Sequence, residues 1–201
     1  MTLITSLIIL FVVYLIGSIP SGLLVSRSCG LEDPRKHGSK NIGATNVLRS
    51  GHKGAALLTF VCDALKGVFG VGLTLFLAPS LMPLACVVVV LGHIFPVWLK
   101  FKGGKGIATA CGACLVFSWP VALLCLITWV AFFVATRYSS VASLAATLAA
   151  PFYSFVLGEY ALGKTSLILA IIILWTHRTN IGRLLKGEEQ HIDNLTKPGS
   201  S

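Results

Sequence analysis

Long apolar stretches separated by short polar segments run through the whole chain. Several reach the roughly 20 residues that a helix needs to cross the hydrocarbon core of a bilayer. Seven stretches can be distinguished, at about residues 3–25, 55–78, 81–99, 106–118, 119–136, 141–158 and 161–176. The fourth is short, so we expect it to be kinked, tilted or partly re-entrant. The pattern predicts an all-α integral membrane protein with seven transmembrane helices, formed as a single domain over residues 1–201.

The basic residues predict the orientation of these helices. Nearly all of the 16 Lys and Arg residues lie on one side of the predicted membrane, in segments 26–54 and 100–105, at Arg137, and in segment 178–197. Lys66 lies inside the second stretch, and Lys164 alone lies on the opposite side. The positive-inside rule then places the N-terminus outside and the C-terminus in the cytoplasm.

Composition narrows the class of protein further. With 55% hydrophobic and 11% charged residues, the chain does not resemble a soluble domain. Its net charge of +9 is confined to one face, where it suits anionic lipid or an anionic substrate. Nucleic acid is not expected as a partner, because the basic residues lie in short juxtamembrane loops without a binding module.

The loop at residues 100–106 has the composition of an anion-binding segment. It combines Lys100, Lys102 and Lys105 with Gly103, Gly104 and Gly106. Glycines allow backbone N–H groups to converge on one anion, and a helix that starts at Gly106 would add its dipole. A Walker loop needs Ser or Thr after its lysine, whereas Gly106 follows Lys105, so nucleotide hydrolysis is not indicated. A basic loop without a ligand is the alternative.

Two more polar segments lie on the same predicted face. Segment 38–49 mixes glycines with hydroxyl, amide and cationic side chains. In segment 177–188, His177, Asn180 and Arg183 recur every three residues and form one stripe if the last helix continues past the membrane surface. An ordinary turn and interfacial anchoring are the respective alternatives.

Several polar positions interrupt the apolar stretches. Asp63 and Lys66 share a helical face, which favours a structural ion pair, with a proton pathway or a brace for an active site as alternatives. Pro20 predicts a kink in the first stretch, beside Ser21. His93 directly precedes the glycine loop. Three glycines, Gly67, Gly70 and Gly72, predict close helix packing.

The polar segments offer many donors to anions and few carboxylates, which argues against glycosidase or metal-hydrolase chemistry. No spacing supplies a convincing metal site, and no Ser-His-Asp order stands out. The residues alone leave open a phospholipid-related transferase, a transporter of organic phosphates and a non-catalytic lipid-binding scaffold.

Four motifs, in order, resemble those of the bacterial acyl-phosphate:glycerol-3-phosphate acyltransferases. They are GSIPSG at 17–22, GSKNIGATN at 38–46, GHIFP at 92–96 with KGGKG at 102–106, and HRTNIGRL at 177–184. The similarity covers nearly the whole chain, although the second motif has Ser39-Lys40 where many members have Ser-Gly. Another acyltransferase family uses His followed by Asp five positions later, and none of the five histidines here has that Asp.

The resemblance implies a multi-pass enzyme of the bacterial inner membrane with its active site on the cytoplasmic side. Such an enzyme transfers a fatty acyl group from acyl phosphate to the 1-hydroxyl of sn-glycerol 3-phosphate, giving lysophosphatidate and phosphate, without a cofactor. The expected partners are these two substrates, membrane lipid and the enzyme that makes acyl phosphate. An organophosphate transporter is the alternative function.

On this resemblance we expect Lys105 and the backbone N–H groups of Gly103, Gly104 and Gly106 to hold one substrate phosphate. The other phosphate is expected to contact Lys40, Asn41, Thr45, Asn46 and Arg49.

The remaining candidates concern acyl transfer itself. His177 and Asn180 would orient the acceptor or polarise the carbonyl, and Ser143 is a further catalytic candidate. The base is either a phosphate oxygen of the acyl donor or His177. Three residues are expected to support the site, namely Ser21, His93 and Glu188, the last by ordering the basic C-terminal segment.

Overall fold

A computed structural model describes residues 1–191, and within that range every regular element is a helix. Lys197, which the charge pattern assigns to the basic side, lies outside the described residues. The α-helices are α1 (Leu3–Ser18), α2 (Ser21–Ser28), α3 (Ala44–Arg49), α4 (Lys53–Leu77), α5 (Met82–Ile94), α6 (Ile107–Phe117), α7 (Trp119–Thr136), α8 (Ser139–Val156), α9 (Tyr160–Thr176) and α10 (Arg178–Leu185). Single 3₁₀ turns form at Pro34–Lys36, Pro79–Leu81 and Val97–Leu99.

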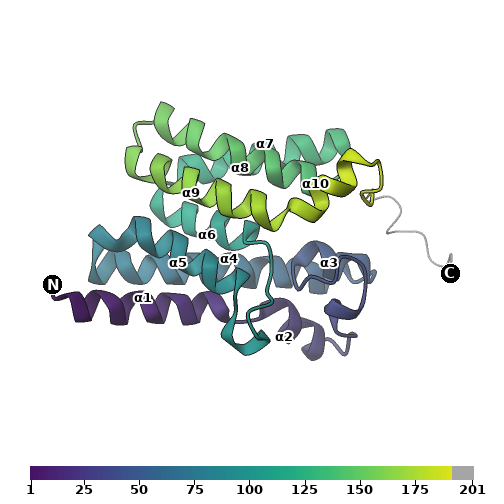
Figure 1. Cartoon of the computed structure of the whole chain (residues 1–201), viewed down its shortest axis with the longest axis horizontal. Coiled ribbons are helices and arrows are strands. Elements are labelled where there is room, and N and C mark those ends of the chain that lie inside the picture. Colours follow the sequence, from purple (N-terminus) through teal and green to yellow (C-terminus); the bar gives the residue numbers. More distant parts are fainter. Residues whose placement is uncertain (192–201) are drawn as a thin grey trace.

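The long helices run side by side along one axis of the molecule. α1, α4 and α5 form one side, α7, α8 and α9 form the other, and α6 lies between them (Figure 1). The short helices α2, α3 and α10 gather toward the same end of the bundle (Figure 1). The predicted break in the first stretch is confirmed, because α1 ends at Ser18 and α2 begins after Pro20.

Five helical segments are long and apolar enough to span a membrane, at Leu3–Ser28, Lys53–Leu77, Pro79–Leu99, Trp119–Thr136 and Ser139–Val156. A sixth candidate combines α9 and α10, which are bent by 61° at their junction. The remaining apolar helix of the predicted seven is α6, which is shorter than the others with 11 residues. The protein is thus an all-helical membrane protein with five or six candidate spans by length and composition.

Glycines allow the helices to approach closely at two interfaces. A Cβ atom at Gly17 of α1 would lie 2.2 Å from the Val89 carbonyl oxygen of α5. Between α4 and α6, a Cβ atom at Gly112 would lie 1.9 Å from the Ala64 carbonyl oxygen. The predicted packing role holds for Gly67 and Gly70 of α4, whose added Cβ atoms would collide with neighbouring elements. The prediction is wrong for Gly72, which faces open space.

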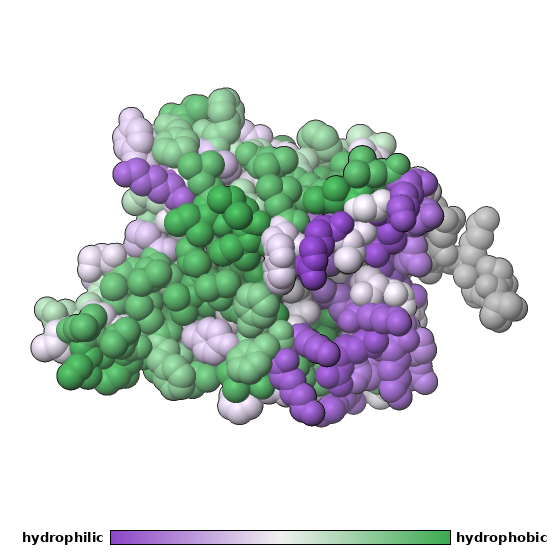
Figure 2. Space-filling model, viewed as in Figure 1, coloured by the Kyte–Doolittle hydropathy of each residue, from purple (hydrophilic) through white to green (hydrophobic). Residues whose placement is uncertain are grey.

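The surface follows the same division between apolar helices and polar loops. Figure 2 shows apolar side chains over most of the bundle and a dense hydrophilic region at the end that carries α2, α3 and α10. Bilayer contact explains the exposed apolar side chains on these helices, such as Phe76, which is 85% exposed, and Ile171, which is 70% exposed. The polar end is therefore the part of the protein where water-soluble molecules can approach the membrane-embedded helices.

Candidate active site

One cavity of about 550 Å³ opens at the polar end and extends between the helices. Residues from all three polar segments singled out in the sequence line it, namely Asn41, Thr45, Asn46, Arg49, Lys105, Gly106, His177 and Asn180, and Ser143 of α8 lines it as well. Deeper in the bundle its walls are largely apolar, as at Ala110, Ala113, Leu126 and Leu169. The cavity therefore joins a cationic mouth to an apolar interior.

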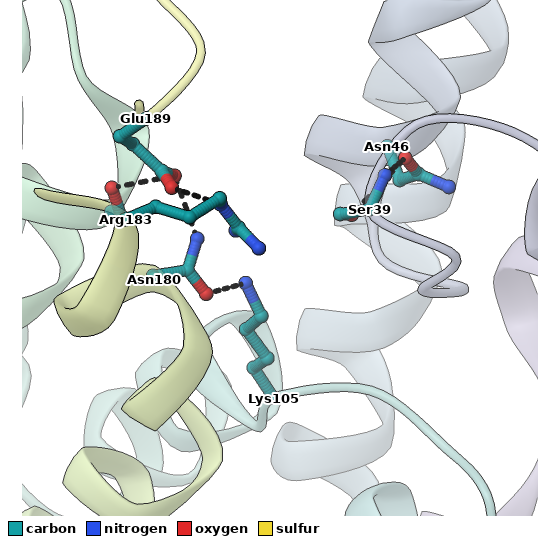
Figure 3. A network of polar contacts seen from close by, with 7 residues as sticks. Ser39, Asn46, Lys105, Asn180, Arg183 and Glu189 are labelled. Carbon is teal, nitrogen blue, oxygen red and sulfur yellow. Dashed lines mark hydrogen bonds and ion pairs between the residues drawn. The ribbon is translucent and has the colours of Figure 1, made fainter. Parts of the chain in front are cut away.

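Glu189 connects the residues of the mouth through one carboxylate. Its Oε1 accepts hydrogen bonds from Asn180 Nδ2 at 2.7 Å and from Ser140 Oγ at 3.0 Å, and its Oε2 accepts from Arg183 Nε at 2.7 Å. Asn180 in turn accepts a 2.5 Å hydrogen bond from Lys105 Nζ (Figure 3). Segments far apart in the sequence are thereby fixed around one point.

Positive charge exceeds negative charge in this network. Lys105 interacts electrostatically with the cations Arg49 and Arg183 and with the carboxylate of Glu189. Burial lowers the pKa of Lys105 to about 8; Glu189 opposes that shift, and the two arginines add to it. Hydrogen bonds from Arg183, Asn180 and Ser140 overcome the effect of burial and lower the pKa of Glu189. An anion in the cavity would balance the remaining charge.

Arg49 supplies a specific hydrogen-bond donor for an anion in this positively charged region. The residue ends α3 and lines the cavity, and its Nε atom is buried without a hydrogen-bond partner among residues 1–191. Burial lowers the pKa of the guanidinium, and Arg183 lowers it further while Glu189 opposes the shift. A buried, unpaired guanidinium N–H is costly unless a ligand accepts its hydrogen bond. Phosphate matches it in charge and geometry.

His177 lies at the junction of α9 and α10 and is 2% exposed. Its Nδ1 lies 2.9 Å from the carbonyl oxygen of Ile173. Because a carbonyl can only accept, Nδ1 carries the proton and Nε2 of the neutral ring is an acceptor. His177 also lines the cavity. The last helix does not continue straight as the predicted stripe requires, because α9 and α10 are bent by 61° at His177, but His177, Asn180 and Arg183 all reach this region.

The structure gives Asn46 a different role from the expected phosphate ligand. Its Nδ2 donates to the carbonyls of Pro34, His37 and Asn41, and its Oδ1 accepts from the backbone and hydroxyl of Ser39 (Figure 3). With both ends of the amide occupied, Asn46 holds the 34–46 loop in shape. The sequence contained no signal for this, since the five partners are mostly backbone atoms.

The remaining polar candidates make local contacts at the wall of the cavity. Thr45 Oγ1 and Ser139 Oγ lie 3.1 Å apart and join α3 to α8. Ser143 Oγ accepts a 3.1 Å hydrogen bond from Trp129 Nε1. Asn41 Oδ1 accepts from the Gly43 backbone at 2.9 Å. These side chains face the cavity while their partners keep them in place.

The prediction that backbone N–H groups of the glycine loop bind phosphate is wrong in part. The amides of Gly103 and Gly104 donate to the carbonyls of Ile94 and His93, both at 3.0 Å, so they are not directed at a phosphate. Gly106 has φ +90° and directly precedes α6, so the predicted helix start is confirmed. The first backbone N–H groups of α6 have no hydrogen-bond acceptors within their own helix, and they lie at the cavity wall. Lys105 is held there by Thr176, whose hydroxyl donates to its carbonyl at 3.1 Å.

The other predicted residues lie away from the mouth. Lys40 is exposed, with φ +55°, and Ser21 is buried at the start of α2; neither contributes to the cavity lining. Glu188 is exposed, and the carboxylate that orders the basic segment is that of Glu189 instead. Sequence reasoning missed Ser140 because it lies 49 residues from its partner Glu189, and it missed Glu189 because the turn at Gly187 decides which glutamate faces the site.

Together these features describe a helical integral membrane protein with a phosphate-compatible site at one end of an apolar cavity. A family model for glycerol-3-phosphate acyltransferase matches residues 7–187. The glycerol-3-phosphate acyltransferase of Methylococcus capsulatus is 45% identical over 182 residues, covering 89% of this chain and 92% of that protein. The corresponding protein of Bordetella petrii is 50% identical over 190 residues, covering 89% of each.

Two crystal structures of PlsY (YgiH), an integral membrane glycerol 3-phosphate acyltransferase, have the same fold. The glycerol 3-phosphate form gives a TM-score of 0.88 at 35% identity and covers 96% of this chain and 100% of that chain. The lysophosphatidic acid form gives a TM-score of 0.85 at 35% identity, covering 93% and 95%. The chain belongs to the glycerol-3-phosphate acyltransferase family, as its four motifs predicted.

Proposed function

We propose that this protein transfers a fatty acyl group from acyl phosphate to the 1-hydroxyl of sn-glycerol 3-phosphate, giving lysophosphatidate and inorganic phosphate. The observation that carries the proposal is the surplus of positive charge around Lys105, Arg49 and Arg183 at the mouth of an apolar cavity. Both substrates carry phosphate, and one also carries a fatty acyl chain. The cationic mouth and apolar interior match these two parts.

The reaction needs positioning more than a strong protein nucleophile. Acyl phosphate is a mixed anhydride, so the 1-hydroxyl oxygen attacks its carbonyl carbon and the carbon–oxygen bond to phosphate breaks. The hydroxyl proton passes to a phosphate oxygen of the donor or to Nε2 of His177. Lys105 and Arg49 stabilise the negative charge on the departing phosphate. Asn180 holds Lys105 in place, and Ser143 and the start of α6 at Gly106 complete the wall.

The remaining predicted residues take supporting roles in this proposal. Asn41 and Thr45 shape the side of the mouth formed by the 34–49 segment, with Asn46 maintaining the loop. Gly103 and Gly104 are needed for space, because an added Cβ would lie 2.1 Å from the His93 carbonyl oxygen and 1.9 Å from His93 Nε2, respectively. Lys40 serves at most as part of the surrounding positive field.

The proposed topology has seven crossings, with the N-terminus outside and the C-terminus and active site in the cytoplasm. α6 is too short to span the bilayer alone, since 11 residues rise by about 16 Å. However, Gly106 before α6 and Arg137 after α7 both line the cavity. The chain thus leaves the polar end through α6 and returns through α7, which supports counting α6 as the fourth crossing.

This topology suits the bacterial inner membrane, where acyl phosphate would arrive from the enzyme that makes it. The test uses protein purified in detergent, with labelled glycerol 3-phosphate and either palmitoyl phosphate or palmitoyl-CoA. Labelled lysophosphatidate from palmitoyl phosphate alone is the expected result. Product from the CoA ester alone contradicts the donor assignment. No product from either donor contradicts acyl transfer and directs attention to transport of organic phosphates in vesicles.

A further inference from the structure

A buried charged cluster takes no part in the chemistry described so far, although two of its members, Asp63 and His93, line the cavity. Lys66 Nζ and Asp63 Oδ1, both in α4, are 2.8 Å apart, which confirms the predicted ion pair. His93 of α5 joins them, with its Nδ1 2.9 Å from Lys66 Nζ and 3.4 Å from Asp63 Oδ1. The three residues are between 2% and 4% exposed.

The cluster ties together elements that meet near the cavity. Lys66 Nζ also donates a 2.8 Å hydrogen bond to the carbonyl of Ile19, in the break between α1 and α2. Because an ammonium group can only donate, Nδ1 of His93 accepts from Lys66. The ring of His93 is therefore fixed in one orientation by α4, and indirectly by the first helix.

The opposite side of the His93 ring touches the loop that carries Lys105. A Cβ atom at Gly104 would lie 1.9 Å from His93 Nε2, so the ring occupies the space that any larger residue would need. The backbone of His93 also accepts the Gly104 amide at 3.0 Å. Gly104 immediately precedes Lys105, whose Nζ reaches Asn180. A continuous set of contacts thus leads from Asp63 and Lys66 to the cation of the active site.

We infer that Asp63, Lys66 and His93 form a positioning cluster that sets the placement of the Lys105 loop and thereby the affinity for substrate phosphate. A buried ion pair is often no more stabilising than apolar residues of similar size, so stability alone explains such a cluster poorly. Charged groups within membrane helices are rare and usually functional. This inference rests on the proposed function, because it assigns Lys105 to substrate phosphate.

The first test asks whether removing the His93 ring relieves a steric clash introduced at Gly104. In Gly104→Ala the new methyl group collides with the His93 ring and displaces Lys105. Lys105 contacts the departing phosphate of the acyl donor in the proposed reaction. We therefore expect the KM for palmitoyl phosphate to rise on the order of tenfold, with a smaller change in kcat. Adding His93→Ala removes the obstructing ring, so the double variant should bind better than Gly104→Ala alone. A double variant no better than the single one would overturn the steric link.

A second set of variants tests whether the ion pair acts through the ring. Asp63→Asn and Lys66→Met should each raise the same KM in the wild-type background and add little once His93 is already Ala. Lys164→Met, at an exposed position away from the cluster, is the matched control. Thermal unfolding in detergent separates loss of fold from loss of position. Full additivity with His93→Ala, or unchanged KM values in folded variants, would overturn the inference.

The two proposals fail differently in these assays. Wild-type protein that makes no lysophosphatidate from either acyl donor contradicts the proposed function, whatever the variants do. Wild-type protein that turns over normally, with Asp63, Lys66 and His93 variants indistinguishable from it, contradicts only the positioning cluster.

Discussion

Lys105 and Asn180, 75 residues apart in the sequence, are joined by a 2.5 Å hydrogen bond from Nζ to Oδ1. This bond connects the loop before α6 to the helix after the last long apolar segment. Asn180 is also fixed by Glu189, so Lys105 is held toward the cavity by a residue that has no freedom to turn away. The contact converts two separate sequence motifs into one site.

The pKa of Lys105 predicts how the reaction depends on pH. The amine is protonated below its pKa of about 8, so a role for the cation predicts that kcat/KM declines as the pH rises through that value. Lys105→Arg keeps its charge throughout, because an arginine loses its proton only above about pH 12. Its activity can be lower, but the alkaline decline should disappear from the range between pH 7 and 10. The same decline in both proteins would contradict the assignment.

Glu188 and Glu189 are adjacent, so substituting each in turn gives a matched test of the hydrogen-bond network at the mouth of the cavity. Glu189→Gln removes the negative partner of Arg183 and weakens the bonds to Asn180 and Ser140. Loss of charged hydrogen bonds of this kind costs about 1.5–3 kcal/mol, so we expect kcat/KM to fall by about ten- to a hundredfold. Glu188→Gln changes an exposed carboxylate and should leave kcat/KM near the wild-type value. Equal losses in both variants would contradict the role of Glu189.

Asn46→Asp tests the clamp on the 34–46 loop with almost no change in volume. A carboxylate would face the carbonyl oxygens of Pro34, His37 and Asn41, which now accept from Nδ2. Leaving such buried groups unpaired costs about 1–3 kcal/mol each, so the loop should open. Faster limited proteolysis within residues 34–46, measured by mass spectrometry, is the expected result.

Lys40→Gly is the control in the same loop. Lys40 is exposed and has φ +55°, a backbone conformation that glycine adopts more easily. The variant should keep its activity and its resistance to proteolysis. A large loss of activity in Lys40→Gly would restore Lys40 as a phosphate ligand.

Cys29 offers a direct test of the proposed orientation. It is an exposed cysteine directly after α2, whereas the other five lie within α4, α5, α6 and α7. A membrane-impermeant maleimide should label Cys29 in inverted vesicles but not in intact cells. Introducing Lys164→Cys into a Cys29→Ser background should place the label at residue 164, located by mass spectrometry, in intact cells but not in inverted vesicles. Labelling of Cys29 from outside intact cells would contradict a cytoplasmic active site.

Much of the membrane architecture follows from local patterns in the sequence. Apolar length predicts the long helices, Pro20 predicts the break after α1, and the spacing of His177, Asn180 and Arg183 predicts their shared location. These features depend on residues within a few turns of one another. The count of spans depends on the bent pair of α9 and α10 and on α6, whose 11 residues are too few for composition alone to decide.

The details of the site depend on contacts that local patterns do not encode. Glu189 rather than Glu188 meets the basic residues because the chain turns after α10, where Gly187 has φ +70°. Asn46 looks like a ligand in a polar motif, yet its amide is occupied by its own loop. The amides of Gly103 and Gly104 were predicted as phosphate donors, but the chain folds back onto the end of α5 and uses them there. The contacts of His93 with Asp63 and Lys66 depend on how α4 and α5 pack together, which local sequence patterns do not show.

In the proposed reaction, the cationic mouth holds substrate phosphate during acyl transfer from acyl phosphate. The most direct measurement follows lysophosphatidate and released phosphate together, from palmitoyl phosphate and glycerol 3-phosphate, in wild-type protein and in Arg49→Met. We expect equal amounts of both products in the wild type and a loss of about tenfold or more in the variant, with unchanged thermal unfolding. Phosphate released without lysophosphatidate, or full activity in Arg49→Met, would contradict it.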